Sequence, residues 1–149
     1  MDLQQILHFH LRKWADVTIS ALPVPLNDAS TFGVIQVHEK QRVTGFKEKS
    51  KRPKPIPGRP NEAFASMGNY LFNKDALLQM LYDEAANVES AHDFGKDILP
   101  RVFNKSRVFA YDFRKNRIPS ITRKEIGYWR DVGTIKVFSE ANMGLRNIK

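Results

Sequence analysis

The stretch FKEKSKRPKP, residues 46–55, places five basic side chains around one carboxylate, Glu48, at the end of a predicted strand. Lys49 is a compact cation that could hold a phosphate group as a point charge. If the chain stays extended, Glu48 points to the opposite side and could accept hydrogen bonds from sugar hydroxyls. The ordinary alternative is a solvated ion pair, because most surface charges contribute little.

A second carboxylate, Asp131, stands between Trp129 and Gly133 in the segment YWRDVGT, residues 128–134. Magnesium binds one or two carboxylates together with phosphate oxygens, so Asp131 is a candidate metal ligand. An ion pair with the neighbouring Arg130 explains the same carboxylate about equally well.

Two further segments, ASMGNY (65–70) and HDFGKD (92–97), combine polar and small residues near the ends of predicted elements. Ligands of open α/β sheets bind at such ends, which makes both segments candidate contacts. Ser66 offers a hydroxyl group there. Structural explanations also exist, because Tyr70 is typical of a core and Asp93 of a helix N-cap.

The composition is that of a globular chain with a strong positive charge. Its 149 residues carry a net charge of +8, with a pI of about 9.8 and no cysteine. This charge favours nucleic acid, acidic membranes or phosphorylated small molecules as partners, and disulfides and thiolate metal sites are excluded. No apolar run approaches the roughly 18 residues of a membrane span. The N-terminus lacks the order of a signal peptide, so we expect a cytoplasmic protein.

Strands are predicted to alternate with helices, which is typical of an α/β fold. We expect one domain over residues 1–149, with a mixed β-sheet flanked by helices. Predicted helices cover residues 3–15, 75–85, 93–103 and from 134 onward, and predicted strands cover residues 16–24, 33–37, 42–48, 65–72 and 108–113. Pro100 should kink or split the third helix.

Two helices show apolar faces that should turn inward. The residues on these faces are Leu3, Ile6, Leu7, Leu11 and Trp14 in the first helix, and Leu77, Leu78 and Leu81 in the second.

The joint order of the motifs resembles the sugar-nucleotide pyrophosphorylases. FxEK at residues 46–49 is followed by ASMGxY at 65–70, AHDFGKD at 91–97 and YWRDVGT at 128–134. The resemblance is closest to the ADP-glucose pyrophosphorylases, also called glucose-1-phosphate adenylyltransferases, and extends over residues 1–148. It implies a partial Rossmann-like nucleotidyltransferase domain.

Enzymes of this family join ATP and glucose 1-phosphate into ADP-glucose and release pyrophosphate, with Mg²⁺ neutralising charge on the phosphates. In bacteria, the product commits glucose to glycogen synthesis. The resemblance implies that Lys49 and Asp131 are catalytic, with Lys49 on the phosphate of glucose 1-phosphate and Asp131 on the metal. The other substrate-binding residues that it implies are Gly33, Glu48, Ser66, Tyr70, Asp93, Phe94 and Trp129.

Three family features have no counterpart in this sequence: a GGxGTRL loop that holds nucleotide phosphates, a second metal-binding aspartate, and a C-terminal β-helix domain. We therefore expect the chain to be the C-terminal, sugar-phosphate-binding portion of a catalytic domain, without appreciable ADP-glucose synthesis by itself. Strands of the other half are expected to pair beside residues 16–23 and to cover residues 3–14. Uncovered edges and apolar faces would then favour homo-oligomers.

Two other functions stay open at this point. A basic nucleic-acid-binding module fits the net charge, although the sequence has no RNP-like or helix-turn-helix pattern. A non-catalytic fragment that binds a partner subunit is the second alternative.

Overall fold

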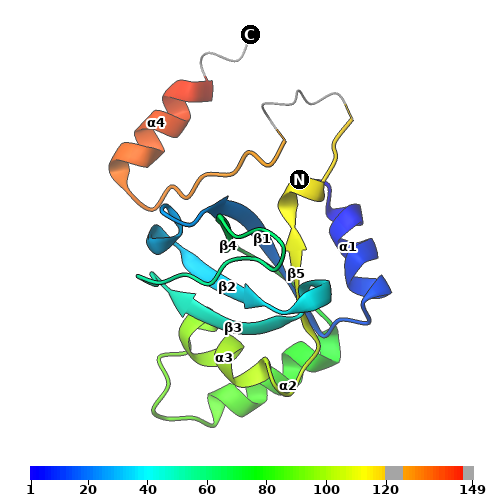
Figure 1. Ribbon diagram of the computed structural model, residues 1–149. Helices are drawn as coiled ribbons and strands as arrows, with labels where there is room; N and C mark the ends of the chain where they lie inside the picture. The colour runs from blue at the N-terminus through cyan, green and yellow to red at the C-terminus, as the bar shows by residue number, and fades with distance from the viewer. Residues whose placement is uncertain (120–125, 146–149) are drawn as a thin grey trace.

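A five-stranded sheet with the order β3-β2-β4-β1-β5 forms the centre of the molecule (Figure 1). The computed structural model describes residues 1–119 and 126–145. The strands are β1 (Val17–Pro25), β2 (Gly33–Val37), β3 (Val43–Glu48), β4 (Glu62–Phe72) and β5 (Val108–Asp112). β1 pairs in parallel with β5, and the other pairs are antiparallel. The expected α/β fold with a mixed sheet is confirmed.

Helices lie on both sides of this sheet. They are α1 (Leu3–Arg12), α2 (Lys74–Ala85), α3 (Leu99–Val102) and α4 (Ile135–Leu145), together with one π-helical turn, η3 (Phe94–Ile98), and the short 3₁₀ turns η1 (Ala29–Thr31), η2 (Glu39–Gln41) and η4 (Phe113–Lys115). Pro100 lies in the first turn of α3, where its missing N–H is tolerated. The predicted third helix is therefore split into η3 and α3, as expected.

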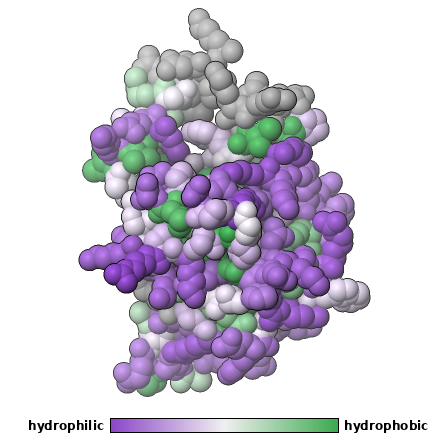
Figure 2. All heavy atoms as spheres, in the orientation of Figure 1, coloured by the Kyte–Doolittle hydropathy of each residue, from purple (hydrophilic) through white to green (hydrophobic). Residues whose placement is uncertain are grey.

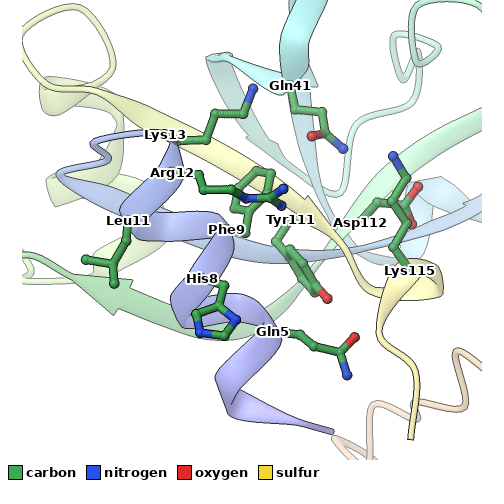
Figure 3. A pocket seen from close by; sticks show the side chains of 10 residues that line it. All are labelled: Gln5, His8, Phe9, Leu11, Arg12, Lys13, Gln41, Tyr111, Asp112 and Lys115. Atoms are coloured by element: carbon green, nitrogen blue, oxygen red, sulfur yellow. The ribbon is translucent and has the colours of Figure 1, made fainter.

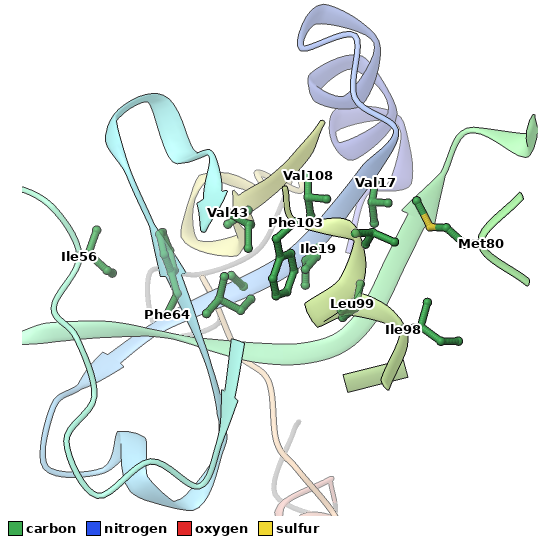
Figure 4. Packing of buried hydrophobic residues seen from close by; sticks show 14 residues of the cluster. Val17, Ile19, Val43, Ile56, Phe64, Met80, Ile98, Leu99, Phe103 and Val108 are labelled. Atoms are coloured by element: carbon green, nitrogen blue, oxygen red, sulfur yellow. The ribbon is translucent and has the colours of Figure 1, made fainter. Parts of the chain in front are cut away.

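Strand alternation divides the core into layers on the two faces of the sheet. In β5, Val108 and Ala110 join the main core, whereas the intervening Phe109 and the following Tyr111 pack under α1. The main core places strand residues against α2, η3 and α3, as Figure 4 shows for Ile19 and its neighbours. This layer carries η3, which later contributes to the candidate site.

The apolar face predicted for the first helix is largely wrong. The buried residues of α1 are Ile6, Phe9 and His10. The other predicted residues are exposed, namely Leu3 (71%), Leu7 (44%), Leu11 (59%) and Trp14 (77%). Contacts from the strands select the observed face, because Phe9 packs edge-to-face on Tyr111 and His10 Nδ1 lies 2.9 Å from Thr18 Oγ1.

The inward face of α2 also differs from the prediction. Leu78 and Leu81 are more than 40% exposed, whereas Met80 and Glu84 are buried. Met80 reaches the main core. Glu84 turns inward because Arg101 and the loop after α2 supply donors for its carboxylate.

The expectation that further strands pair beside residues 16–23 is wrong for this structure, because β1 has neighbours on both sides. β5 occupies the edge opposite β4, with Val17 in register with Val108. An ion pair fixes this parallel register: the backbone N–H and the Nη2 of Arg107 each donate to the Asp16 carboxylate at 2.7 Å.

Hydrophilic side chains cover most of the face seen in Figure 2, and the hydrophobic groups on it are small and separate. The leucines and Trp14 of α1 are exposed and leave apolar surface that self-association would cover. The expected homo-oligomer stays a prediction. Within residues 1–119 and 126–145, no helix has the length and apolar character needed to cross a membrane.

The Asp16–Arg107 pair predicts a specific loss of stability in acid. Hydrogen bonds from Arg107 hold the pKa of the Asp16 carboxyl below its ordinary value of about 3.8. Such a carboxyl stabilises the fold above its unfolded-state pKa, and this stabilisation is lost as pH falls through the lowered folded-state pKa. In urea unfolding series between about pH 5 and pH 2, Asp16→Asn should therefore lose less stability than the unchanged protein. Equal losses would contradict the pairing.

Candidate functional site

One open cavity of about 1360 Å³ lies where the ends of β2, β3 and β4 meet η3 and the segment before α4. All nine residues that the sequence singled out line this cavity. They are Gly33, Glu48, Lys49, Ser66, Tyr70, Asp93, Phe94, Trp129 and Asp131. The fold thus gathers four segments around one space: the β2–β3 hairpin with Gly33, Glu48 and Lys49, and residues 66–70, 93–94 and 129–131.

The β2–β3 hairpin positions Glu48 and Lys49. Gly33 pairs with Glu48, and the Lys49 N–H donates to the Phe32 carbonyl at 3.0 Å. Lys49 has a left-handed φ of 45°, so the extended strand ends at Glu48. The extended chain on which the opposite directions of the two side chains depended therefore ends before Lys49, and both residues line the cavity.

The ring of Phe46 occupies the space beside two glycines of the site. A Cβ atom at Gly33 would overlap the ring and would lie 2.9 Å from Glu48 Oε2, and one at Gly95 would lie 3.1 Å from Phe46 Cε1. Gly33 is thus needed for its small size, and Gly95 leaves little room for a side chain. Phe46 links the hairpin that carries Glu48 and Lys49 to the π-helical turn η3.

Tyr70 and Phe94 form an aromatic wall. Their rings stack with centroids 6.0 Å apart, and Phe72 packs against both. Burial raises the pKa of the Tyr70 hydroxyl. A hydrogen bond with Ser66 lowers this pKa in part, and the nearby charge of Asp93 raises it further. The Tyr70 hydroxyl therefore stays protonated at neutral pH, as a donor and acceptor in the cavity.

Asp93 stands directly before η3. Its carbonyl accepts hydrogen bonds from the Asp97 and Ile98 N–H groups, at 2.8 and 3.2 Å. Its own N–H donates to the Asp97 carboxylate at 3.0 Å. The backbone of Asp93 is thus fixed at the start of a π-helical turn, a feature that is frequent at functional sites.

Trp129 and Asp131 come from the segment before α4. The Trp129 ring packs on Phe32, with centroids 5.7 Å apart, and Asp131 Oδ1 accepts from the Gly133 N–H at 3.1 Å. In the part of the chain that the structure describes, no ion pair joins Asp131 to Arg130. The carboxylate of Asp131 instead lines the cavity and is exposed to solvent.

The cavity is richer in carboxylates than in cations, although the protein is basic. Its carboxylates are Asp28, Glu48, Asp93, Asp131 and Glu140, and its cations are Lys49 and Arg130. Such a lining can accept hydrogen bonds from several hydroxyls while Lys49 attracts an anion. Outside the two undescribed stretches, no group of three or more His, Cys, Asp or Glu could hold a metal by itself. A single carboxylate such as Asp131 suits a cation that also takes phosphate oxygens.

Sequence reasoning missed several lining residues. Phe32 precedes Gly33, and Phe46 belongs to the FxEK motif, but neither was assigned to the site. Their motif neighbours Gly33 and Glu48 were the available signal. Asp28 and Glu140 carry no motif that could have identified them.

A second, smaller cavity of about 910 Å³ lies between α1, η2 and the end of β5 (Figure 3). Its basic side chains are Arg12, Lys13 and Lys115. The Lys13 ammonium is already engaged, because it donates to the Lys40 carbonyl at 3.2 Å and lies over the rings of Phe9 and Phe109. None of the nine predicted site residues lines this groove.

Part of the positive charge is neutralised within the fold. The ion pairs are Arg59–Asp112, Arg59–Glu62, Arg101–Glu84, Arg107–Asp16 and Arg114–Glu62. These four arginines lie in the two stretches of the sequence that are richest in basic residues, 47–59 and 101–124. Their pairing weakens the argument for nucleic-acid binding from charge alone.

Comparison with known proteins identifies the family of this chain. The profile of the nucleotidyl transferase family matches residues 1–148. The chain belongs to this family. The expected transferase fold and family are thereby confirmed, and none of the comparisons supports the nucleic-acid alternative.

Three curated relatives illustrate the similarity within the family. The glucose-1-phosphate adenylyltransferase of Photobacterium profundum is 52% identical over 145 residues, 97% of the chain and 35% of the relative. Those of Anaeromyxobacter sp. and Thermus thermophilus are 50% and 49% identical, over 99% and 97% of the chain and 36% and 35% of the relatives. The chain thus spans about a third of the length of these relatives.

Replacing Gly33 by alanine tests the packing around Phe46. The added methyl group would push the Phe46 ring and the Glu48 carboxylate out of place. Overpacking of this kind costs about 1–3 kcal/mol of unfolding free energy, which urea unfolding can measure. Gly144→Ala is the matched control, because a Cβ there meets open space within α4. Equal stabilities of Gly33→Ala and the unchanged protein would refute the tight packing.

Proposed function

We propose that this chain is the glucose 1-phosphate-binding part of a glucose-1-phosphate adenylyltransferase. The observation that carries the proposal is the convergence of nine motif residues from four segments on one cavity. The names of the three relatives support the choice of sugar phosphate and nucleotide. The whole enzyme would make ADP-glucose for glycogen synthesis in the cytoplasm, as the resemblance of the motifs implies.

The proposed reaction joins two phosphates. A phosphate oxygen of glucose 1-phosphate attacks the α-phosphorus of ATP, the bond from that phosphorus to the bridging oxygen breaks, and pyrophosphate leaves. Protein groups contribute mainly by holding the reactants in line and by stabilising charge. Lys49, which lines the cavity just after the strand ends, holds the sugar phosphate.

Hydroxyl recognition falls to the acidic and aromatic lining. Glu48 and Asp93 accept hydrogen bonds from sugar hydroxyls, and the aromatic wall of Tyr70 and Phe94 covers the apolar edge of the sugar ring. Trp129, in the segment before α4, packs on Phe32. Gly33 and Ser66 complete the sugar-phosphate site by allowing close approach and by offering a hydroxyl.

Asp131 is the proposed magnesium ligand. The fit rests on the chemistry of the lining, since a single exposed carboxylate facing a phosphate-binding cavity suits an ion that takes one or two carboxylates plus phosphate oxygens. When bound, Mg²⁺ neutralises charge on the phosphates. The hydrogen bond from the Gly133 N–H orients the carboxylate for this role.

The proposal predicts glucose 1-phosphate binding that depends on Lys49. Loss of one hydrogen bond to a charged group costs about 1.5–3 kcal/mol, so Lys49→Gln should weaken binding about 10- to 100-fold in isothermal calorimetry. Lys51→Gln makes the same charge change two residues away, at a side chain that does not line the cavity. Equal weakening by both variants would mean that general electrostatic attraction, and not a contact with Lys49, explains the effect. Absence of binding to the unchanged protein would refute the proposal.

Metal binding gives a separate test. With glucose 1-phosphate present, Mn²⁺ used in place of Mg²⁺ should broaden the amide resonances of residues 131–133. Asp131→Asn should weaken this effect about tenfold or more, because it removes the proposed carboxylate ligand. Glu140→Gln is the matched control at another carboxylate of the same cavity. Broadening that Asp131→Asn leaves unchanged would exclude this ligand.

A further inference from the structure

Glu84 is a buried carboxylate outside the cavity. Its side chain is 5% exposed, on the inner face of α2. Three side chains surround it: Arg101 Nη1 donates to Oε2 at 3.0 Å, the Ser90 hydroxyl donates to Oε1, and His92 Nδ1 lies 3.5 Å from Oε1. A carboxylate in such a place costs free energy unless its partners are well placed.

Ser90, His92 and Arg101 flank the segment 93–98, from which Asp93, Phe94 and Gly95 line the cavity. Ser90 and His92 directly precede Asp93, and Arg101 lies in α3, directly after η3. Both ends of the segment 93–98 are thus tied to one side chain of α2. The tie continues along the backbone, because the His92 N–H donates to the Ser90 hydroxyl at 3.0 Å.

The backbone at His92 needs such a tie. Its φ of 58° is left-handed, a conformation that costs free energy for a residue with a side chain and persists only when its surroundings hold it. The left-handed turn at His92 sets the direction in which the chain enters η3. Asp93 and Phe94, the next two residues, both line the cavity.

We propose that Glu84 is a positioning residue of the candidate site. It holds the turn from Ser90 to His92 and the start of α3, and so fixes Asp93 and Phe94 against the bound sugar. Glu84 itself does not line the cavity. The role toward the sugar rests on the proposed function, whereas the ordering of residues 86–95 does not.

Two measurements on the full 149-residue chain test this inference. Glu84→Gln keeps the shape of the side chain and removes its charge. Hydrogen exchange followed by mass spectrometry should show about tenfold faster exchange in peptides covering residues 86–95, because opening of this turn is no longer opposed by the contacts of Ser90 and Arg101 with a charged carboxylate. Glucose 1-phosphate affinity, measured by calorimetry on folded protein, should fall about tenfold.

Matched variants separate positioning from general stability. Asp83→Asn removes a charge one residue earlier, at an exposed side chain, and should change neither readout. Glu84→Asp retains the carboxylate and should restore part of both. Should Glu84→Gln fail to fold, Arg101→Gln, at a side chain that is 51% exposed, should reproduce the faster exchange and the weaker binding.

The outcomes are distinct. Faster exchange together with weaker binding supports the inference. Unchanged exchange, or faster exchange with unchanged affinity, overturns it, because Glu84 then does not act on the site. If the unchanged protein does not bind glucose 1-phosphate, the proposed function fails, and the exchange measurement alone decides whether Glu84 orders the turn.

Discussion

The packing of Phe46 between Gly33 and Gly95 is the constraint on which the site depends. The ring takes the volume that a Cβ would need at Gly33 and closely approaches the position of one at Gly95, and it also packs against the main core. Because proteins pack their interiors closely, this ring fixes the distance between the β2–β3 hairpin and η3. Glu48, Lys49 and the aromatic wall therefore line one cavity at fixed relative positions.

The rest of the fold holds these two parts in place. β1 and β4 form the longest pairing of the sheet, and η3 and α3 rest on its main core. The charged groups of the site lie at or just beyond the ends of elements: Lys49 follows β3, Asp93 precedes η3, and Asp131 precedes α4. Such placement gives reactive groups a rigid support while leaving them open to a ligand. In the inference above, Glu84 gives the loop after α2 the same kind of rigid support.

The sequence predicted the fold class and the residues around the cavity more successfully than the helix faces. Strands such as β1 have a short β-branched pattern between turn formers, and motif order identified Lys49 and Asp93. In α1, by contrast, two apolar stripes compete, and only contacts with Tyr111 and Thr18 select the buried one. Burial of Glu84 depends on donors from a loop and from α3, which no local pattern contains. The left-handed turn at Lys49 is likewise set by the hairpin partner.

Amide chemical-shift mapping with glucose 1-phosphate tests the central claim most directly. If the larger cavity binds the sugar phosphate, the shifts should concentrate at residues 32–33, 48–49, 66–70, 93–95 and 129–131, which come from all four segments. Shifts confined to the basic groove beside α1, at His8, Arg12 and Lys115, would contradict the account, because they would place the sugar phosphate in the other cavity.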